Sequence, residues 1–73
     1  MKPYVVVKRN LQWHMMIAGQ EPGLIRHDDR DFVVRLASDV AALNDGLVSV
    51  YGEDGQLSYA LRFKGGVAVR DPN

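Results

Sequence analysis

The first part of the chain alternates hydrophobic and polar residues in the manner of paired strands. Residues 4–7 are rich in β-branched side chains, and residues 11–17 place apolar side chains at every second position, at Leu11, Trp13, Met15 and Ile17. The polar segment 8–10 is short enough for a hairpin turn, and Asn10 can adopt a left-handed conformation there. The pattern therefore predicts an antiparallel hairpin. After glycine and proline in residues 19–23, residues 24–26 predict a short edge strand.

One amphipathic helix is predicted from Asp29 to Leu43. Apolar residues recur at helical spacing and form one stripe that we assign to the core: Val33, Leu36, Ala37, Val40 and Leu43. Asp28 or Asp29 can accept hydrogen bonds from the amides of the first turn, and Asp31 adds negative charge where the helix dipole favours it. Residues 44–46, Asn-Asp-Gly, predict a left-handed stop after the last turn.

Residues 47–51 and 57–63 predict a second hairpin, joined by a turn at residues 52–55. Two consecutive glycines then interrupt the pattern. Because the C-terminal segment has little apolar surface, we expect residues 65–73 to form a flexible tail and residues 1–64 to form a single domain.

These elements predict an α+β fold of two layers, with the order β-β-(β)-α-β-β: a mainly antiparallel sheet of four or five strands carries one helix on one face. We expect these side chains to point toward the helix: Val5, Val7, Leu11, Trp13, Met15, Val48, Val50, Leu57, Tyr59 and Leu61. We expect these to point outward: Tyr4, Val6, Lys8, Gln12, His14, Met16 and Arg62. Such an exposed mixture of apolar, aromatic and basic groups is typical of a recognition surface.

Composition narrows the possible functions. A chain of 73 residues, nearly half of them hydrophobic, supports one small core. It has no cysteine, which excludes a disulfide scaffold, a thiol nucleophile and a cysteine zinc site. Nine basic residues balance nine acidic residues, so the net charge gives no general attraction to nucleic acid. The sequence contains no apolar run of membrane-spanning length and no secretory pattern, so we expect a soluble, cytoplasmic protein.

Few residues are candidates for catalysis or metal binding. The two histidines, His14 and His27, lack neighbours that would form a nucleophile and its base. Asp28, Asp29 and Asp31 could offer oxygen ligands, but the glycine and distal glutamate of a calcium-binding loop are missing. A helix cap is the favoured interpretation of these aspartates. We therefore expect no enzymatic activity, no cofactor and no metal.

The chain as a whole, from Met1-Lys2-Pro3-Tyr4-Val5-Val6-Val7-Lys8-Arg9-Asn10 through Gly65-Gly66, resembles small lytic-bacteriophage proteins that bind host bacterial RNA polymerase. The resemblance lies in overall size and order of elements. It implies inhibition of transcription initiation, antitermination, and binding near the amino-terminal part of the β′ subunit. The chain also resembles a family of small uncharacterised bacterial domains, through Trp13 on a strand, Ala37 and Ala41 on the helix, and Asp54-Gly55 in the last turn.

The outward face supplies the candidate contacts to the polymerase, because no short motif carries residue roles over from the resemblance. We expect Tyr4, Val6 and Met16 to be apolar contacts, and Lys8, Arg9, His14 and Arg62 to be polar or charged contacts. Two alternatives remain open at this point: an interaction module with a different partner, and a nucleic-acid-binding domain. A small hydrolase or other enzyme is a more distant third.

Overall fold

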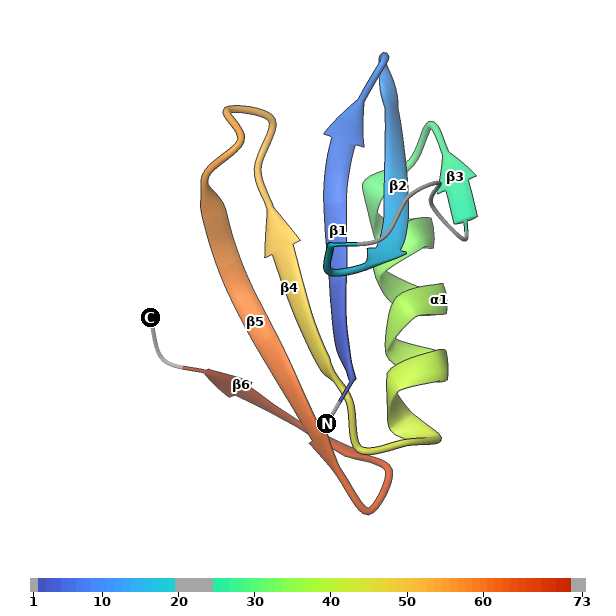
Figure 1. Ribbon diagram of the computed structural model, residues 1–73, viewed down its shortest axis with the longest axis vertical. Helices are drawn as coiled ribbons and strands as arrows, with labels where there is room; N and C mark the ends of the chain where they lie inside the picture. The colour runs from blue at the N-terminus through green and yellow to red at the C-terminus, as the bar shows by residue number, and fades with distance from the viewer. Residues whose placement is uncertain (1, 20–24, 72–73) are drawn as a thin grey trace.

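The computed structural model describes residues 2–19 and 25–71, which form one helix and a mixed six-stranded sheet (Figure 1). The helix α1 spans Arg30–Ala42. The strands are β1 (Pro3–Arg9), β2 (Gln12–Ile17), β3 (Ile25–His27), β4 (Leu47–Tyr51), β5 (Leu57–Lys64) and β6 (Val67–Asp71). The α+β class with a single helix is confirmed for the described residues. The expected number of strands, four or five, is wrong because residues 67–71 form a sixth.

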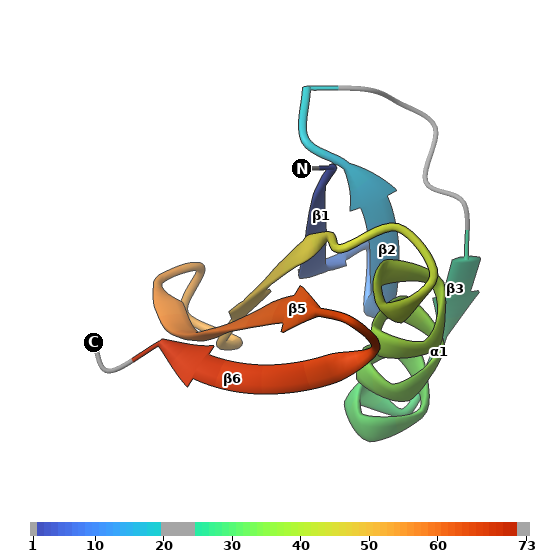
Figure 2. The same cartoon turned by 90° about the horizontal axis from the view of Figure 1, so that it is seen from below.

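The strands lie in the order β3-β2-β1-β4-β5-β6, and β1 and β4 pair in parallel. All other neighbouring strands are antiparallel. The two halves of the chain therefore join at the centre of the sheet, and the connection between them runs through α1, as a parallel pairing requires. Figure 2 shows the twisted sheet curving partly around the helix.

The edges of the sheet show one confirmed prediction and one correction. The short strand expected near residues 24–26 is β3, at the edge beside β2; Leu24 lies outside the described residues.

The expected flexible tail is wrong for residues 67–71, because Gly65 and Gly66 form a hairpin turn that folds β6 back onto β5. Both glycines have positive φ, which a tight two-residue hairpin turn requires. The missed signal was this glycine pair between alternating segments.

Helix α1 begins and ends close to the predicted boundaries. Asp29 is the N-cap residue, and its side chain accepts a hydrogen bond from the Asp31 amide at 3.0 Å. The side chains that α1 buries are small: Val33, Ala37 and Ala41 are 0% exposed. Small residues let the helix backbone approach the sheet closely. Leu43, which we assigned to the core stripe, is 87% exposed at the C-cap, so that assignment is wrong.

The core lies between α1 and one face of the sheet. Its buried members from the strands are Tyr4, Val6, Trp13, Met15, Val48, Val50 and Phe63. The predicted inward orientation is confirmed for Trp13, Met15, Val48 and Val50, and Tyr59 and Leu61 pack partly against this core. Leu57 is 49% exposed, because a register irregularity at Val50 and Tyr51 changes how the start of β5 pairs with β4.

The predicted orientation of β1 is wrong. Tyr4 and Val6, expected outward, are 2% and 0% exposed, and the alternate residues Val5 and Val7 lie on the opposite face. Residues 4–7 are all apolar, so alternation alone cannot determine which of them face the helix. The register with β2 determines it, and a shift of one residue moves every side chain to the other face.

The turn between β1 and β2 explains how that register arises. Asn10 and Leu11 form the turn, with φ of +52° and +69°, while Lys8 and Arg9 belong to β1. Leu11 is therefore 86% exposed, and the prediction that it shares the inward face of Trp13 is wrong. The shorter turn pairs Val6 with Met15, which places both side chains beneath the helix.

The turn after α1 brings the start of β1 against the start of β4. Asp45 supplies the left-handed residue, with φ of +53°, and the following Gly46 is buried. A Cβ atom at Gly46 would lie 2.9 Å from the Tyr4 ring and 3.0 Å from the Lys2 carbonyl oxygen. Gly46 is therefore needed for close packing and not for its φ.

Candidate protein-binding surface

The sheet face opposite α1 is the main candidate for a binding surface, and we refer to it as the open face. Strand register places these residues on it: Val5, Val7, His14, Met16, Ser49, Tyr51, Ala60 and Arg62. On β6, Val67 and Val69 pair with Lys64 and Arg62 and extend this face to the sheet edge. The helix covers only the other face, as Figures 1 and 2 show.

The open face is apolar at its centre and polar toward β5. Val5 lies between Met16 and Ser49 on the neighbouring strands, and Val7 lies beside His14. These valines are half-buried, whereas Met16 is only 6% exposed. Tyr51 is half-buried at the end of β4, and Arg62 is exposed on β5. Partial burial by neighbouring strands restrains these side chains and leaves apolar surface accessible to a partner.

Two of the residues proposed as apolar contacts do not belong to this surface. Tyr4 and Val6 are buried beneath α1, where the Tyr4 hydroxyl oxygen accepts a hydrogen bond from Asn44 Nδ2 at 2.7 Å. Their assignment as surface contacts is therefore corrected. Met16 does lie on the open face, but its low exposure limits its direct contribution. The structure instead places Val5, Val7 and Tyr51 there, which the sequence pattern did not identify.

Lys8 is also oriented differently from the prediction, because it lies on the helix side of β1. Its Nζ donates a hydrogen bond to Glu53 Oε1 at 2.6 Å and lies 5.9 Å from the Trp13 ring centroid. The hydrogen bond and charge of Lys8 lower the pKa of the Glu53 carboxyl below its ordinary value. The pair joins the β1–β2 hairpin to the β4–β5 turn. Lys8 thus has an intramolecular role in the fold.

The other charged candidates lie at separate places on the molecule. His14 and Arg62 are on the open face, two strands or more apart, and Arg9 is exposed at the end of β1. The predicted residues therefore do not form one cluster. His14 and Arg62 flank the apolar centre of the open face, while Arg9 is at the tip of the β1–β2 hairpin.

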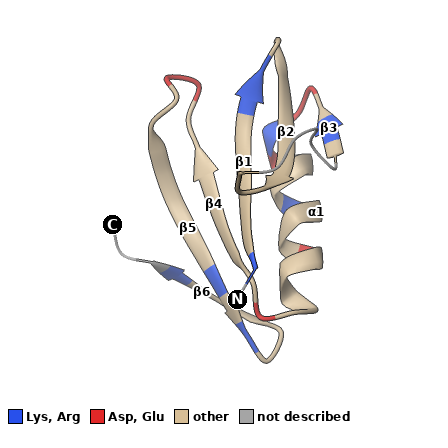
Figure 3. Ribbon diagram, viewed as in Figure 1, with Lys and Arg blue, Asp and Glu red and all other residues tan. Residues whose placement is uncertain are grey.

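Basic residues are more concentrated around the β5–β6 hairpin. Figure 3 shows Lys and Arg positions on β5 and on β6. Arg62, Lys64 and Asp45 line a hollow there together with Phe63. The Asp45 Oδ1 atom accepts a hydrogen bond from the Gly65 amide at 3.0 Å, which connects this carboxylate to the hairpin turn. Two basic side chains and one carboxylate therefore lie around this hollow.

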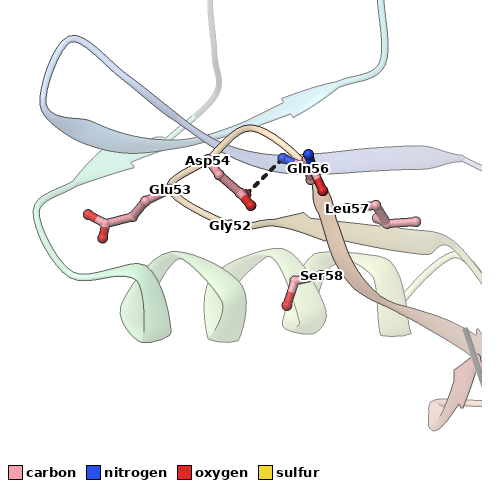
Figure 4. Close-up of a pocket in the computed structure, with 6 residues that line it drawn as sticks. All are labelled: Gly52, Glu53, Asp54, Gln56, Leu57 and Ser58. Carbon is pink, nitrogen blue, oxygen red and sulfur yellow. Dashed lines mark hydrogen bonds between the residues drawn. The ribbon is translucent and has the colours of Figure 1, made fainter.

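A second hollow lies at the β4–β5 turn, where Figure 4 shows its lining side chains. Its two carboxylates already have intramolecular partners. Glu53 pairs with Lys8, and Asp54 Oδ1 accepts a hydrogen bond from the Gln56 amide at 3.0 Å. These contacts are typical of a turn that stabilises itself. We assign this hollow a structural role.

The aspartates at the start of α1 also make local contacts. Asp28 accepts a hydrogen bond from Gln12 Nε2 at 3.0 Å, and His27 Nδ1 accepts one from the Asp29 amide. The His27 ring stacks on Phe32 with a centroid separation of 4.3 Å. Within residues 2–19 and 25–71, no three His, Cys, Asp or Glu side chains gather closely enough to hold a metal ion.

Comparison of the chain with protein-family models, curated proteins and solved structures finds no match. In the part of the chain that the structure describes, no helix is long and apolar enough to cross a membrane.

Proposed function

We propose that this protein is a regulator of transcription that binds bacterial RNA polymerase through its open face. We infer the polymerase as the partner from the resemblance to small phage proteins that bind it. The observation that supports the surface is the arrangement of Val5, Val7 and Tyr51 on the face opposite α1. Arg62 lies on the same face, where it pairs with Leu47 at the other end of β4 from Tyr51. An apolar centre bordered by polar groups is the usual anatomy of a protein interface.

Tyr51 and Arg62 are the best candidates for energetic anchors in this interface. Tyrosine and arginine are enriched among residues that dominate binding energy, because each buries a large area and also fixes orientation by hydrogen bonding. Their strands are neighbours in the sheet, so a single partner surface can contact both. The two valines of β1 would then exclude water from the centre of the contact.

In this proposal the protein acts by binding the polymerase and does not catalyse a reaction. Binding near the amino-terminal part of β′ would hinder promoter recognition and reduce the response to terminators, as the resemblance implies. A partner of this kind also places the protein in the cytoplasm of the bacterial host cell. The sheet provides a rigid platform, so little ordering entropy would be lost on binding.

The proposal is tested by measuring the affinity of purified bacterial RNA polymerase for the wild-type protein and for Tyr51→Ala and Arg62→Ala. We expect each substitution to weaken binding by about tenfold or more, as for interface anchors generally. Leu43→Ala is the matched control, because Leu43 is 87% exposed at the end of α1, away from the open face. Promoter-dependent initiation and terminator readthrough should change with the wild-type protein and the control, and less with the anchor variants.

Two results would contradict the proposal. One is the absence of polymerase binding at micromolar protein concentration. The other is binding that requires DNA or RNA and weakens steeply with salt, as several phosphate contacts would cause. The latter result would favour the nucleic-acid-binding alternative.

A further inference from the structure

Strand β6 forms one edge of the sheet, and its backbone geometry can be assigned from the hairpin turn. Gly65 and Gly66 have φ of +59° and +81°, and Lys64 pairs with Val67 across this two-residue turn. The pair that closes such a turn exchanges backbone hydrogen bonds across the hairpin, and hydrogen-bonded and non-hydrogen-bonded pairs then alternate along the strand. Val67 and Val69 consequently direct their N–H and C=O groups toward β5. Ala68 and Arg70 direct theirs away from the sheet.

The side chains of β6 differ between its two faces. Val67 and Val69 are 64% and 60% exposed and extend the open face to the sheet edge. Arg70 lies on the other face, where its guanidinium is 4.5 Å from the Tyr59 ring centroid. Stacking on an aromatic ring holds the guanidinium in one place and leaves its donors available for a carboxylate. One face of the edge is therefore apolar and the other is basic.

We propose that β6 binds an extended segment of the polymerase as an additional strand, and that this segment alternates apolar and acidic residues. This inference rests on the proposed function. The outward N–H and C=O groups of Ala68 and Arg70 would pair with the backbone of the segment, as in other proteins that bind peptides at a sheet edge. Its apolar side chains would contact Val67 and Val69. Its carboxylates would lie on the face of Arg70, because alternate residues of a strand point to opposite faces.

The charges near β6 favour this partner over a second copy of the chain. Arg62, Lys64 and Arg70 surround the edge, whereas the described carboxylate in this region, Asp45, accepts a hydrogen bond from the Gly65 amide. Pairing of two β6 strands would bring the basic side chains of two hairpins near one another, which is unfavourable. An acidic segment instead meets charges of opposite sign.

Substitutions at Ala68 test the backbone contact while leaving the pairing with β5 in place. Proline at position 68 removes an outward N–H and is tolerated on an exposed sheet edge, whereas Ala68→Thr at the same position keeps the N–H. We expect Ala68→Pro to weaken polymerase binding by about tenfold, and Ala68→Thr to bind within about twofold of the wild-type protein. Melting curves and amide spectra of both free variants check that each one folds.

Amide hydrogen exchange in the complex provides an independent measurement. We expect the amides of Ala68 and Arg70 to exchange more slowly in the wild-type protein when polymerase is bound. If Ala68→Pro binds as tightly as Ala68→Thr, or if both amides exchange at the same rate with and without polymerase, strand addition at β6 is wrong and the proposed function stands. If the wild-type protein does not bind polymerase at all, the proposed function itself fails. If Ala68→Pro does not fold, the exchange measurement on the wild-type protein decides the question.

Discussion

At the residue scale, backbone conformation decides which side chains reach the open face. Leu11 has a φ of +69°, a region that costs an L-residue roughly 1–2 kcal/mol relative to glycine. This strained leucine, together with Asn10, produces the short turn that sets the register of β1 against β2. The register then places Val5 and Val7 on the open face and buries Tyr4 and Val6.

Replacing Leu11 with glycine should therefore stabilise the protein. We expect Leu11→Gly to raise the free energy of unfolding by about 0.5–1 kcal/mol, because relief of strain exceeds the added entropy of the unfolded chain. Little apolar burial would be lost, since Leu11 is 86% exposed. Urea denaturation measures the difference. A destabilised variant would show that the leucine side chain makes a contribution that its exposure does not indicate.

The Lys8–Glu53 ion pair predicts a dependence on pH. The pKa of Glu53 is lowered from its ordinary value of 4.5 by the hydrogen bond and charge of Lys8. The pair therefore contributes stability above pH 4.5, and this contribution is lost as the pH falls through the lowered pKa. Lys8→Ala should raise the pKa of Glu53 toward 4.5 in an NMR titration. An unchanged titration midpoint in Lys8→Ala would mean that Lys8 does not stabilise the carboxylate in solution.

At the element scale, the positions of the helix and of most strands follow from the sequence. Which face of each strand points toward the helix does not always follow from it. The helix could be placed because its N-cap and C-cap residues, Asp29 and Leu43, are the predicted limits, and the left-handed Asp45 follows two residues later. The inward residues of β4 followed from the alternation in Leu47–Tyr51. For β1 the inward residues could not be predicted, because residues 4–7 are all apolar. The parallel pairing of β1 with β4 depends on long-range contacts that no local pattern encodes.

The same limitation affected the candidate site. His14 and Arg62 were predicted on the correct face because their own strands alternate clearly. Tyr4 and Val6 were predicted on the wrong face because the orientation of β1 was predicted wrongly. β6 was missed because Gly65 and Gly66 were interpreted as the end of regular structure, and because residues 67–70 are exposed and depend on pairing with β5 for their order.

The packing of α1 on the sheet predicts contrasting effects of two alanine substitutions. Met15 is 1% exposed, so Met15→Ala should lower the free energy of unfolding by about 2–5 kcal/mol through lost burial and a residual cavity. Leu43→Ala, at a position that is 87% exposed, should change it by less than about 0.5 kcal/mol. Thermal or urea unfolding of both variants measures this. Equal effects would contradict the observed placement of the core.

At the scale of the whole molecule, the described residues form one helix on one side of a six-stranded sheet, and none of their other elements packs on the opposite side or on the β6 edge. The buried core contains no charged residue among those described, and the charges lie at the turns, on the helix surface, on β1 and β3 and on the β5–β6 hairpin. Surface substitutions are therefore expected to leave the fold intact. The proposed function requires that the open face contacts the polymerase.

Site-specific photo-crosslinking tests this claim most directly. A photoreactive phenylalanine derivative at position 51 resembles the native Tyr51 on the open face, and the same group at position 39 replaces an exposed aspartate of α1. With purified bacterial RNA polymerase, the account predicts crosslinks from position 51 to the polymerase, within the amino-terminal part of β′, and none from position 39. Crosslinks from position 39 alone, or from neither position, would contradict it.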